Sequence, residues 1–165
     1  MKLTAAVLTI SDSCHRGERE DASGPRLQQC LRDAGFEIVL NKILPDELEQ
    51  IADALRQSSQ QARFVVTTGG TGIAARDVTP EATRKVCDRL LDGVAQLMRA
   101  EGLKQTPFAA LSRGLCGAIG NSLVLNVPGN PKGAEASLKS VLHLIPHALD
   151  LLAGKTEHQN HRSQQ

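Results

Sequence analysis

The segment "FVVTTGGTGIAARDVTPEAT", residues 64–83, connects a strand pattern to a helix pattern through three glycines. Residues 63–68 are mainly apolar or β-branched, which is typical of a strand that is buried on both faces. Thr79 and Pro80 are residue types favoured at the cap and the first position of a helix, which we predict to continue over 81–91. The segment therefore predicts a strand–loop–helix unit of an α/β protein.

The same alternation of strands and helices continues along the chain. Further strands are predicted at 5–11, 36–44 and 122–127, and further helices at 23–35 (with Ser23 as cap), 45–60, 93–103 and 134–152. This order predicts a mostly parallel sheet that helices cover on both faces, and in such folds ligands bind at the carboxyl ends of the strands. We expect residues 1–154 to form one domain and residues 155–165 to form a frayed polar tail.

The composition argues against several classes of function. The chain has 165 residues, of which 19 are basic and 18 acidic, so the net charge of +1 gives little support for nucleic-acid binding. Its longest apolar run is far shorter than the ~20 residues that a membrane span requires. The four cysteines form no CxxC pair, which favours reduced thiols in a cytoplasmic protein over a zinc site or a disulfide framework.

The loop "TTGGTG", residues 67–72, is a candidate phosphate-binding site. Glycine permits positive φ angles and the close approach of an anion, so that successive N–H groups can face one phosphate. A tight turn without a ligand is the alternative reading of these glycines. The stretch 70–75 also fits the dinucleotide pattern GxGxxA, but the predicted helix begins only at Thr79, and no Walker-type Gly-Lys-Ser/Thr follows.

Two acids lie just beyond the predicted strands. Asp46 follows the strand at 36–44, and Asp77 follows the glycine loop, so both fall at the same edge of the sheet. Two carboxylates at this edge could share Mg²⁺, which binds carboxylate oxygens together with phosphate and water. For Asp46 the alternative is a role as a helix cap, whereas Asp77 has no obvious capping role.

Three basic residues, Arg76, Arg113 and Lys132, lie in predicted loops rather than on helix faces. Each is a candidate for contact with an anionic ligand, and the alternative for each is a solvated surface position. A nucleophilic side chain is not indicated, because adjacent Cys14 and His15 cannot form a dyad and no G-x-S-x-G motif occurs.

Five motifs, taken together and in order, resemble one known family. They are "TISDS", "LPDE", "TTGGTGIAARDVTPEAT", "PFAALSRG" and "LNVPGNPKG". Their order and spacing are similar to those of the molybdopterin-binding domains of molybdenum-cofactor biosynthesis, in particular the single-domain adenylyltransferases. The resemblance covers residues 4–153. It implies a three-layer α/β/α sandwich, a homotrimer, and transfer of AMP from Mg-ATP to molybdopterin, which a partner enzyme then loads with molybdate.

The resemblance also implies roles for individual residues. Asp46 and Asp77 would be the catalytic acids and would hold Mg²⁺. The residues that would shape the pterin and nucleotide site are Ser11, Asp12, Thr68, Gly69, Gly70, Thr71, Gly72, Ser112, Arg113, Pro128, Gly129 and Lys132. One position departs from the family pattern, since Glu47 stands where a second aspartate is frequent after Asp46.

Two other functions remain open at this stage. A carrier or scaffold module of the same fold would bind molybdopterin without turnover, and such a module would retain the glycine loop but lose the acids. The family also contains a subtype whose physiological activity is less certain. Both acids are present here, which favours the enzyme.

Overall fold

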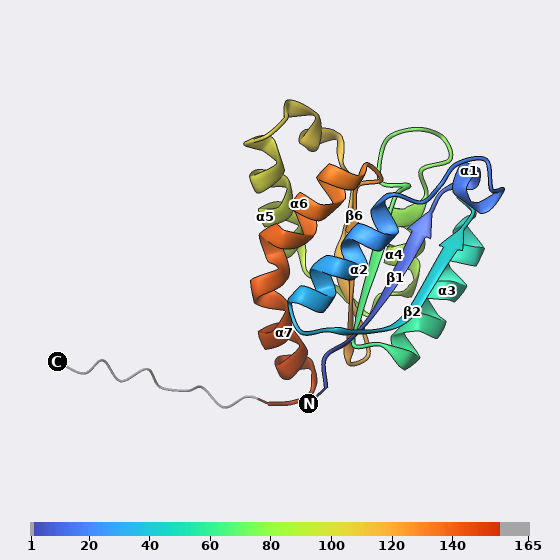
Figure 1. The fold of residues 1–165 in the computed structure, drawn as a ribbon. Helices are drawn as coiled ribbons and strands as arrows, with labels where there is room; N and C mark the ends of the chain where they lie inside the picture. Colours follow the sequence, from blue (N-terminus) through green and yellow to red (C-terminus); the bar gives the residue numbers. More distant parts are fainter. Residues whose placement is uncertain (1, 156–165) are drawn as a thin grey trace.

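In a computed structural model that describes residues 2–155, a six-stranded sheet lies between two layers of helices (Figure 1). The strands are β1 (Thr4–Ile10), β2 (Glu37–Leu44), β3 (Phe64–Thr68), β4 (Arg89–Leu90), β5 (Cys116–Ile119) and β6 (Ser122–Val127). The α-helices are α1 (Asp12–His15), α2 (Ser23–Asp33), α3 (Leu48–Gln61), α4 (Thr79–Val86), α5 (Asp92–Leu103), α6 (Pro131–Val141) and α7 (Ile145–Leu152), with 3₁₀ helices η1 (Pro107–Leu111) and η2 (Leu142–Leu144). The predicted three-layer α/β/α fold is confirmed.

The sheet has the strand order β2-β1-β3-β6-β5-β4. The first four strands in this order are parallel, whereas β5 is antiparallel to both of its neighbours. In the parallel part, Val66 of β3 lies between Val7 of β1 and Leu125 of β6. The loops that follow β1, β3 and β6 therefore leave the sheet side by side at one edge.

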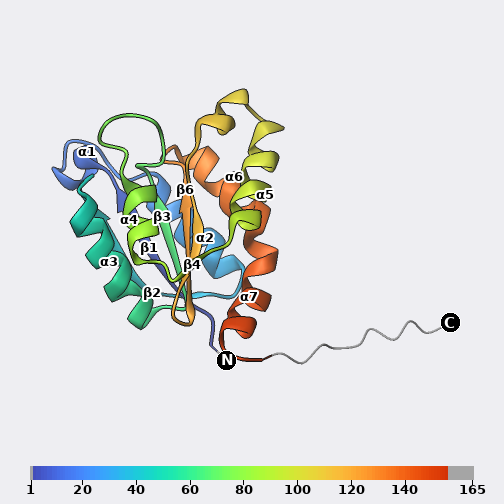
Figure 2. The same ribbon diagram turned by 180° about the vertical axis from the view of Figure 1, so that it is seen from behind.

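Each face of the sheet has its own hydrophobic core. Helices α2, α5, α6 and α7 cover one face, and α3 and α4 cover the other (Figures 1 and 2). Successive residues of β1 point to opposite faces, so Val7 packs with Leu27 and Leu138, and Leu8 packs in the second core with Ile51. All five side chains are at most 1% exposed, and burial of each contributes roughly 1.5–3 kcal/mol.

Two predicted helices are different in the structure, and two short strands were not predicted. The helix predicted over 81–91 ends at Val86, after which the chain forms β4 in an antiparallel pair with β5. Neither β4 nor β5 was predicted from the sequence. The helix predicted over 134–152 is divided into α6 and α7, because Pro146 has no N–H with which to continue the helical hydrogen bonds.

The two predicted helix caps are also wrong by one position. Ser23 is the first residue of α2, and the carboxylate of Asp21 accepts the backbone N–H of Gly24 at 2.9 Å instead. Thr79 is the first residue of α4, and its hydroxyl donates to the carbonyl oxygen of Gly69 at 2.9 Å. This bond attaches the glycine loop to the start of α4.

The predicted polar tail lies, apart from Lys155, outside the described residues. In the part of the chain that the structure describes, no helix is long and apolar enough to cross a membrane.

Candidate functional site

Two adjoining cavities open at the edge of the sheet where the loops after β1, β3 and β6 meet. The larger cavity measures about 550 Å³, and its mainly apolar wall includes Phe108 and Leu111. The smaller cavity measures about 440 Å³ and is more polar. Gly70, Asp77 and Gly129 line both cavities. The predicted loops therefore surround one site with two compartments.

The glycines after β3 allow the loop to pass close to other groups. Gly69 and Gly70 have φ angles of +99° and +66°, in a region that L side chains rarely adopt. A Cβ atom on Gly69 would lie 2.2 Å from the carbonyl oxygen of Ile10, and one on Gly72 would lie 2.7 Å from the carboxylate of Asp77. Glycine is thus required both for the turn and for the approach of a predicted catalytic acid.

The loop presents three consecutive backbone N–H groups to a ligand. The N–H groups of Gly70, Thr71 and Gly72 donate no hydrogen bond to any group within residues 2–155. The N–H of Gly69 differs, because it donates to the carbonyl oxygen of Val127 at 3.2 Å. Successive N–H groups without protein acceptors are suited to an anion such as phosphate. Within the predicted loop 67–72, the candidate phosphate site therefore comprises the N–H groups of residues 70–72.

Asp46, after β2, is held in place by Asp12, after β1. The N–H of Asp46 donates to the Asp12 carboxylate at 3.0 Å, and the N–H of Asp12 donates to the Asp46 carboxylate at 2.9 Å. Asp46 does not cap α3, since Glu47 occupies that position and makes no capping hydrogen bond. Burial raises the pKa of Asp46, as do the nearby charges of Asp12 and Asp77.

Arg76 forms ion pairs with protein acids and is not a free loop cation. Its guanidinium contacts the Asp12 carboxylate at 2.6 and 3.2 Å and the Glu47 carboxylate at 2.9 Å. The hydrogen bond from Arg76, together with the one from the Asp46 N–H, lowers the pKa of Asp12 to about 2. Glu47, the departure from the family pattern, thus has a structural partner in Arg76.

The second predicted catalytic acid, Asp77, has a local structural role as well. Its carboxylate accepts the N–H of Ala74 at 2.9 Å and so closes a turn within the loop. This bond was not predicted. Asp77 lines both cavities and Asp46 lines the smaller one, so the structure brings the two acids to the same cavity.

The chemistry of Asp46 and Asp77 fits a divalent cation. In each carboxylate Oδ2 accepts one backbone N–H, while Oδ1 accepts no hydrogen bond from the described residues. A cation here would offset the negative charges that contribute to the raised pKa of Asp46. No cluster of three or more His, Cys, Asp or Glu suited to a metal occurs in residues 2–155. Mg²⁺, which readily takes phosphate and water as its other ligands, matches this donor set.

Arg113 contacts the loop after β3 and lines neither cavity. Its Nε donates to the carbonyl oxygen of Gly72 at 2.8 Å, and Nη2 donates to that of Asp77 at 2.7 Å. Its backbone N–H donates to the carbonyl oxygen of Thr71 at 2.9 Å, and Nη1 pairs with Glu81 of α4. Arg113 was predicted to contact an anionic ligand, but in the structure its guanidinium binds the loop backbone and holds the loop in place.

The other predicted site residues mostly line the cavities. Ser11 and Thr68 line the smaller cavity, Thr71, Ser112 and Pro128 line the larger one, and Gly129 lines both. Lys132 is exposed near the start of α6 and lines neither of them. The structure thus gathers most of the predicted residues at the cavities, whereas Asp12, Arg113 and Lys132 line neither of them.

Several wall residues were not predicted, among them Phe108 and Asp21. Phe108, in η1, is 75% exposed at the larger cavity; it belongs to the motif "PFAALSRG", but no role was predicted for it. Asp21, at the smaller cavity, accepts the hydroxyl of Thr9 at 2.7 Å and gave no signal, because acids in polar loops are common.

The fold and the cavities together define a three-layer α/β protein with a two-compartment candidate ligand site at the carboxyl edge of its parallel strands. The chain belongs to the family described as "Probable molybdopterin binding domain", whose model matches residues 6–147. The resemblance seen in the sequence motifs is confirmed.

Individual relatives agree with this family. Molybdopterin adenylyltransferase of Helicobacter pylori strain J99 is 42% identical over 156 residues, covering 90% of this chain and 86% of that protein. The molybdenum cofactor synthesis protein cinnamon of Drosophila melanogaster is 42% identical over 153 residues, covering 91% of this chain, which spans 26% of its length. The crystal structure of the molybdopterin biosynthesis enzyme MoaB from Thermus thermophilus has a TM-score of 0.87 and 46% identity, covering 93% of this chain and 98% of that one.

Proposed function

We propose that the chain is a molybdopterin adenylyltransferase, which transfers AMP from ATP to the terminal phosphate of molybdopterin and releases pyrophosphate. The observation that carries this proposal is the junction of two cavities at Gly70 and Asp77, beside three loop N–H groups that have no acceptor within residues 2–155. A transfer between two phosphorylated substrates requires neighbouring binding sites of this kind. Membership of the molybdopterin-binding family and the identity to the Helicobacter pylori enzyme support the proposal.

The two cavities suit different parts of the substrates. The apolar wall of the larger one, with Phe108 at its edge, suits the planar pterin ring, since aromatic side chains stack on flat heterocycles. The smaller one contains the acids Asp46 and Asp77 and suits the triphosphate of ATP with its cation. The phosphate of molybdopterin and the α-phosphate of ATP would then meet at the glycine loop.

This arrangement matches the geometry of nucleotidyl transfer. A phosphate oxygen of molybdopterin attacks the α-phosphorus of ATP, while the bond between that phosphorus and the pyrophosphate oxygen breaks. Attacking and leaving oxygens lie roughly in line, on opposite sides of the phosphorus, as expected for substrates held in two adjoining cavities. The N–H groups of residues 70–72 would stabilise charge on the phosphate oxygens, and no nucleophilic side chain is required.

Asp46 and Asp77 would hold Mg²⁺ in this scheme. When bound, the ion would supply positive charge to the phosphate oxygens and orient the triphosphate. The protein keeps both acids in position beforehand, since Asp12 binds the backbone of Asp46 and Arg113 binds the backbone of Asp77. Ser11, Thr68, Thr71, Ser112, Pro128 and Gly129 would complete the walls around the substrates.

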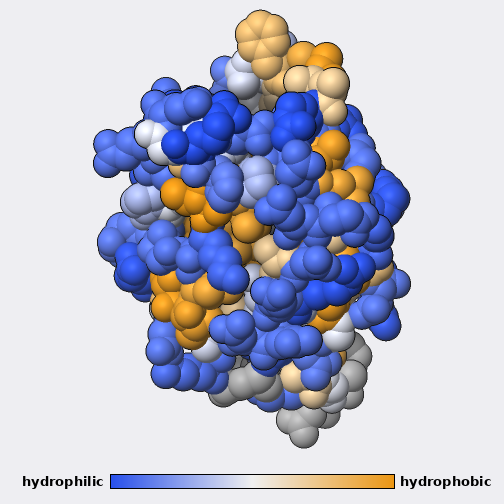
Figure 3. Space-filling model, turned by 90° about the vertical axis from the view of Figure 1, so that its right-hand side faces the viewer, coloured by the Kyte–Doolittle hydropathy of each residue, from blue (hydrophilic) through white to orange (hydrophobic). Residues whose placement is uncertain are grey.

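We also propose that the chain acts in the cytoplasm as a homotrimer and passes its product to a molybdate-inserting enzyme. Exposed apolar side chains support self-association, because large apolar groups on a surface often mark protein contacts. Val39 and Ile43 of the edge strand β2 are 38% and 41% exposed. Apolar patches lie among hydrophilic groups on that side of the molecule (Figure 3).

The test is incubation of the purified protein with Mg²⁺, ATP and molybdopterin, followed by measurement of pyrophosphate and of adenylyl-molybdopterin. We expect both products in equal amounts, and neither when one substrate is left out. A carrier or scaffold would bind molybdopterin and release no pyrophosphate. That result from folded protein would replace the adenylyltransferase proposal with the carrier.

A further inference from the structure

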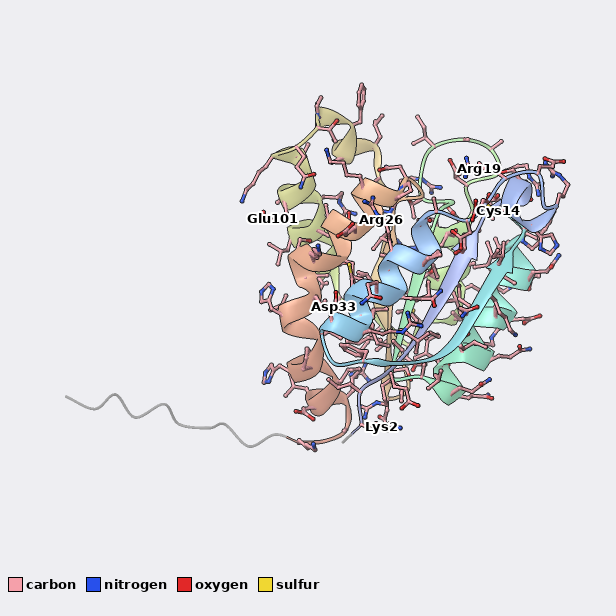
Figure 4. All side chains as sticks on the ribbon, viewed as in Figure 1. Lys2, Cys14, Arg19, Arg26, Asp33 and Glu101 are labelled. Atoms are coloured by element: carbon pink, nitrogen blue, oxygen red, sulfur yellow. The ribbon has the colours of Figure 1, made fainter. Side chains whose placement is uncertain are left out.

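Arg19 provides a cationic side chain at the smaller cavity. It lies between α1 and α2, on the segment that forms one wall of this cavity (Figure 4). Among the described residues that line either cavity, Arg19 is the one that carries a positive charge. The same cavity is lined by four acids, namely Glu20, Asp21, Asp46 and Asp77.

The guanidinium of Arg19 has no partner within residues 2–155, neither a hydrogen bond nor an ion pair. Its neighbour Arg16 pairs with Glu18 at 2.8 Å. The adjacent Asp21 is occupied elsewhere, because its carboxylate accepts the hydroxyl of Thr9 and the N–H of Gly24. Arg19 therefore has all its donors available to a ligand.

None of the three loop cations predicted from the sequence lines this cavity, Lys132 included. Arg76 is bound to Asp12 and Glu47, and Arg113 is bound to loop carbonyl groups. The acids that line this cavity would repel the outer phosphates of a bound triphosphate. The single Mg²⁺ proposed between Asp46 and Asp77 would offset only part of this repulsion. A guanidinium matches phosphate oxygens in geometry as well as in charge.

We infer that Arg19 binds the β- and γ-phosphates of ATP, the part that leaves as pyrophosphate. This inference rests on the proposed adenylyltransferase function and adds the residue that distinguishes ATP from AMP. AMP lacks the outer phosphates, so its affinity will not depend on Arg19. Pyrophosphate, as the released product, will depend on it.

The experiment measures the affinity of ATP and of AMP by calorimetry in the presence of Mg²⁺, for the wild type and for Arg19→Ala. Loss of charged hydrogen bonds is expected to weaken ATP binding about tenfold or more and to leave AMP binding within about twofold. Arg19→Lys will recover part of the ATP affinity. Arg16→Ala is the matched control, because it removes an arginine three positions away that lines neither cavity, and both affinities will stay unchanged.

Other results of the ATP and AMP measurements would overturn the role of Arg19. Equal loss of ATP and AMP affinity in Arg19→Ala would overturn the inference, because Arg19 would then shape the cavity rather than contact the outer phosphates. Unchanged ATP affinity would overturn it too. If wild-type protein releases pyrophosphate from ATP while Arg19→Ala binds ATP normally, the inference fails and the proposed function stands. If the wild type neither binds ATP nor releases pyrophosphate, both fail.

Discussion

The carboxylates of Asp12 and Asp46 each accept the backbone N–H of the other residue, at 3.0 and 2.9 Å. This reciprocal pair joins the end of β1 to the end of β2, two neighbouring strands of the sheet. Asp12 lines neither cavity, whereas Asp46 lines the smaller one. The position of a proposed metal ligand thus depends on a residue outside the cavities.

Asp12→Ala is expected to lower the adenylylation rate by up to about 100-fold, because Asp46 loses the acceptor for its N–H and moves. Asp12→Asn retains a carbonyl oxygen as an acceptor and will lose less. Rates of pyrophosphate release and urea unfolding curves for both variants test this. Equal rates in Asp12→Ala and the wild type would show that Asp46 does not need this support.

Asp77→Asn is expected to fold normally, because the amide oxygen can still accept the N–H of Ala74. It will lose adenylylation by two orders of magnitude or more, which corresponds to roughly 3 kcal/mol of activation free energy. Pyrophosphate release is the measurement, and Asp53→Asn, on an exposed part of α3, is the control. Near-normal activity of Asp77→Asn would remove this acid from the chemistry.

Gly69→Ala is expected to destabilise the fold by roughly 3 kcal/mol, since the new methyl group meets the Ile10 carbonyl oxygen and the φ angle is positive. Gly93→Ala in α5 is the matched control, because a Cβ atom there meets nothing within 4 Å, and its free energy of unfolding will change by less than about 1 kcal/mol. Chemical denaturation of both variants measures the difference. Similar stabilities would show that the loop can relax around an alanine.

Arg113→Lys is expected to reduce the adenylylation rate about tenfold while binding of ATP changes little. Lysine keeps the charge but cannot bridge the Gly72 and Asp77 carbonyl groups as the planar guanidinium does. Separate measurement of the rate and of ATP affinity tests this, with Arg84→Lys on the exposed face of α4 as control. A large loss of ATP affinity at an unchanged rate would instead make Arg113 a direct ligand contact.

The ion pair between Arg76 and Asp12 predicts a pH dependence of stability. The pKa of Asp12 is about 2 in the folded protein and 3.8 ordinarily, so the folded state releases this proton more readily. The stabilisation is therefore complete above about pH 4 and is lost as the pH falls towards about 2. Urea midpoints of the wild type and Arg76→Gln will differ at pH 7 and converge near pH 2. A constant difference over this range would contradict the assignment.

The parallel half of the sheet follows from local sequence patterns. β1, β3 and β6 are short runs of mainly apolar or β-branched residues, and parallel order alone brings Ser11, Gly69 and Gly129 to one edge. β4 and β5 have too few residues to show an alternating hydrophobic pattern. They form strands because β4 pairs with β5 and β5 pairs with β6. Such short strands depend on tertiary contacts that no local pattern records.

The residue types of the candidate site were predictable, but the choice of partners was not. Arg76, Arg113 and Lys132 look alike in the sequence as loop cations. The structure binds the first to Asp12, the second to loop carbonyl groups, and leaves the third exposed. Arg19 gave no signal, because it lies in a polar loop among acids. Which residues far apart in the chain form ion pairs or hydrogen bonds depends on their distances in the folded protein, and the sequence does not give these distances.

The bonds from Thr79 and Arg113 to the loop after β3 have a consequence for the thermodynamics of recognition. They fix this backbone when the protein folds, so its conformational entropy is already lost before a substrate arrives. Substrate binding then requires little further ordering of the loop, so more of the free energy of the new contacts contributes to affinity. Free and liganded forms will therefore share one backbone path here, and substrates will bind without a slow rearrangement.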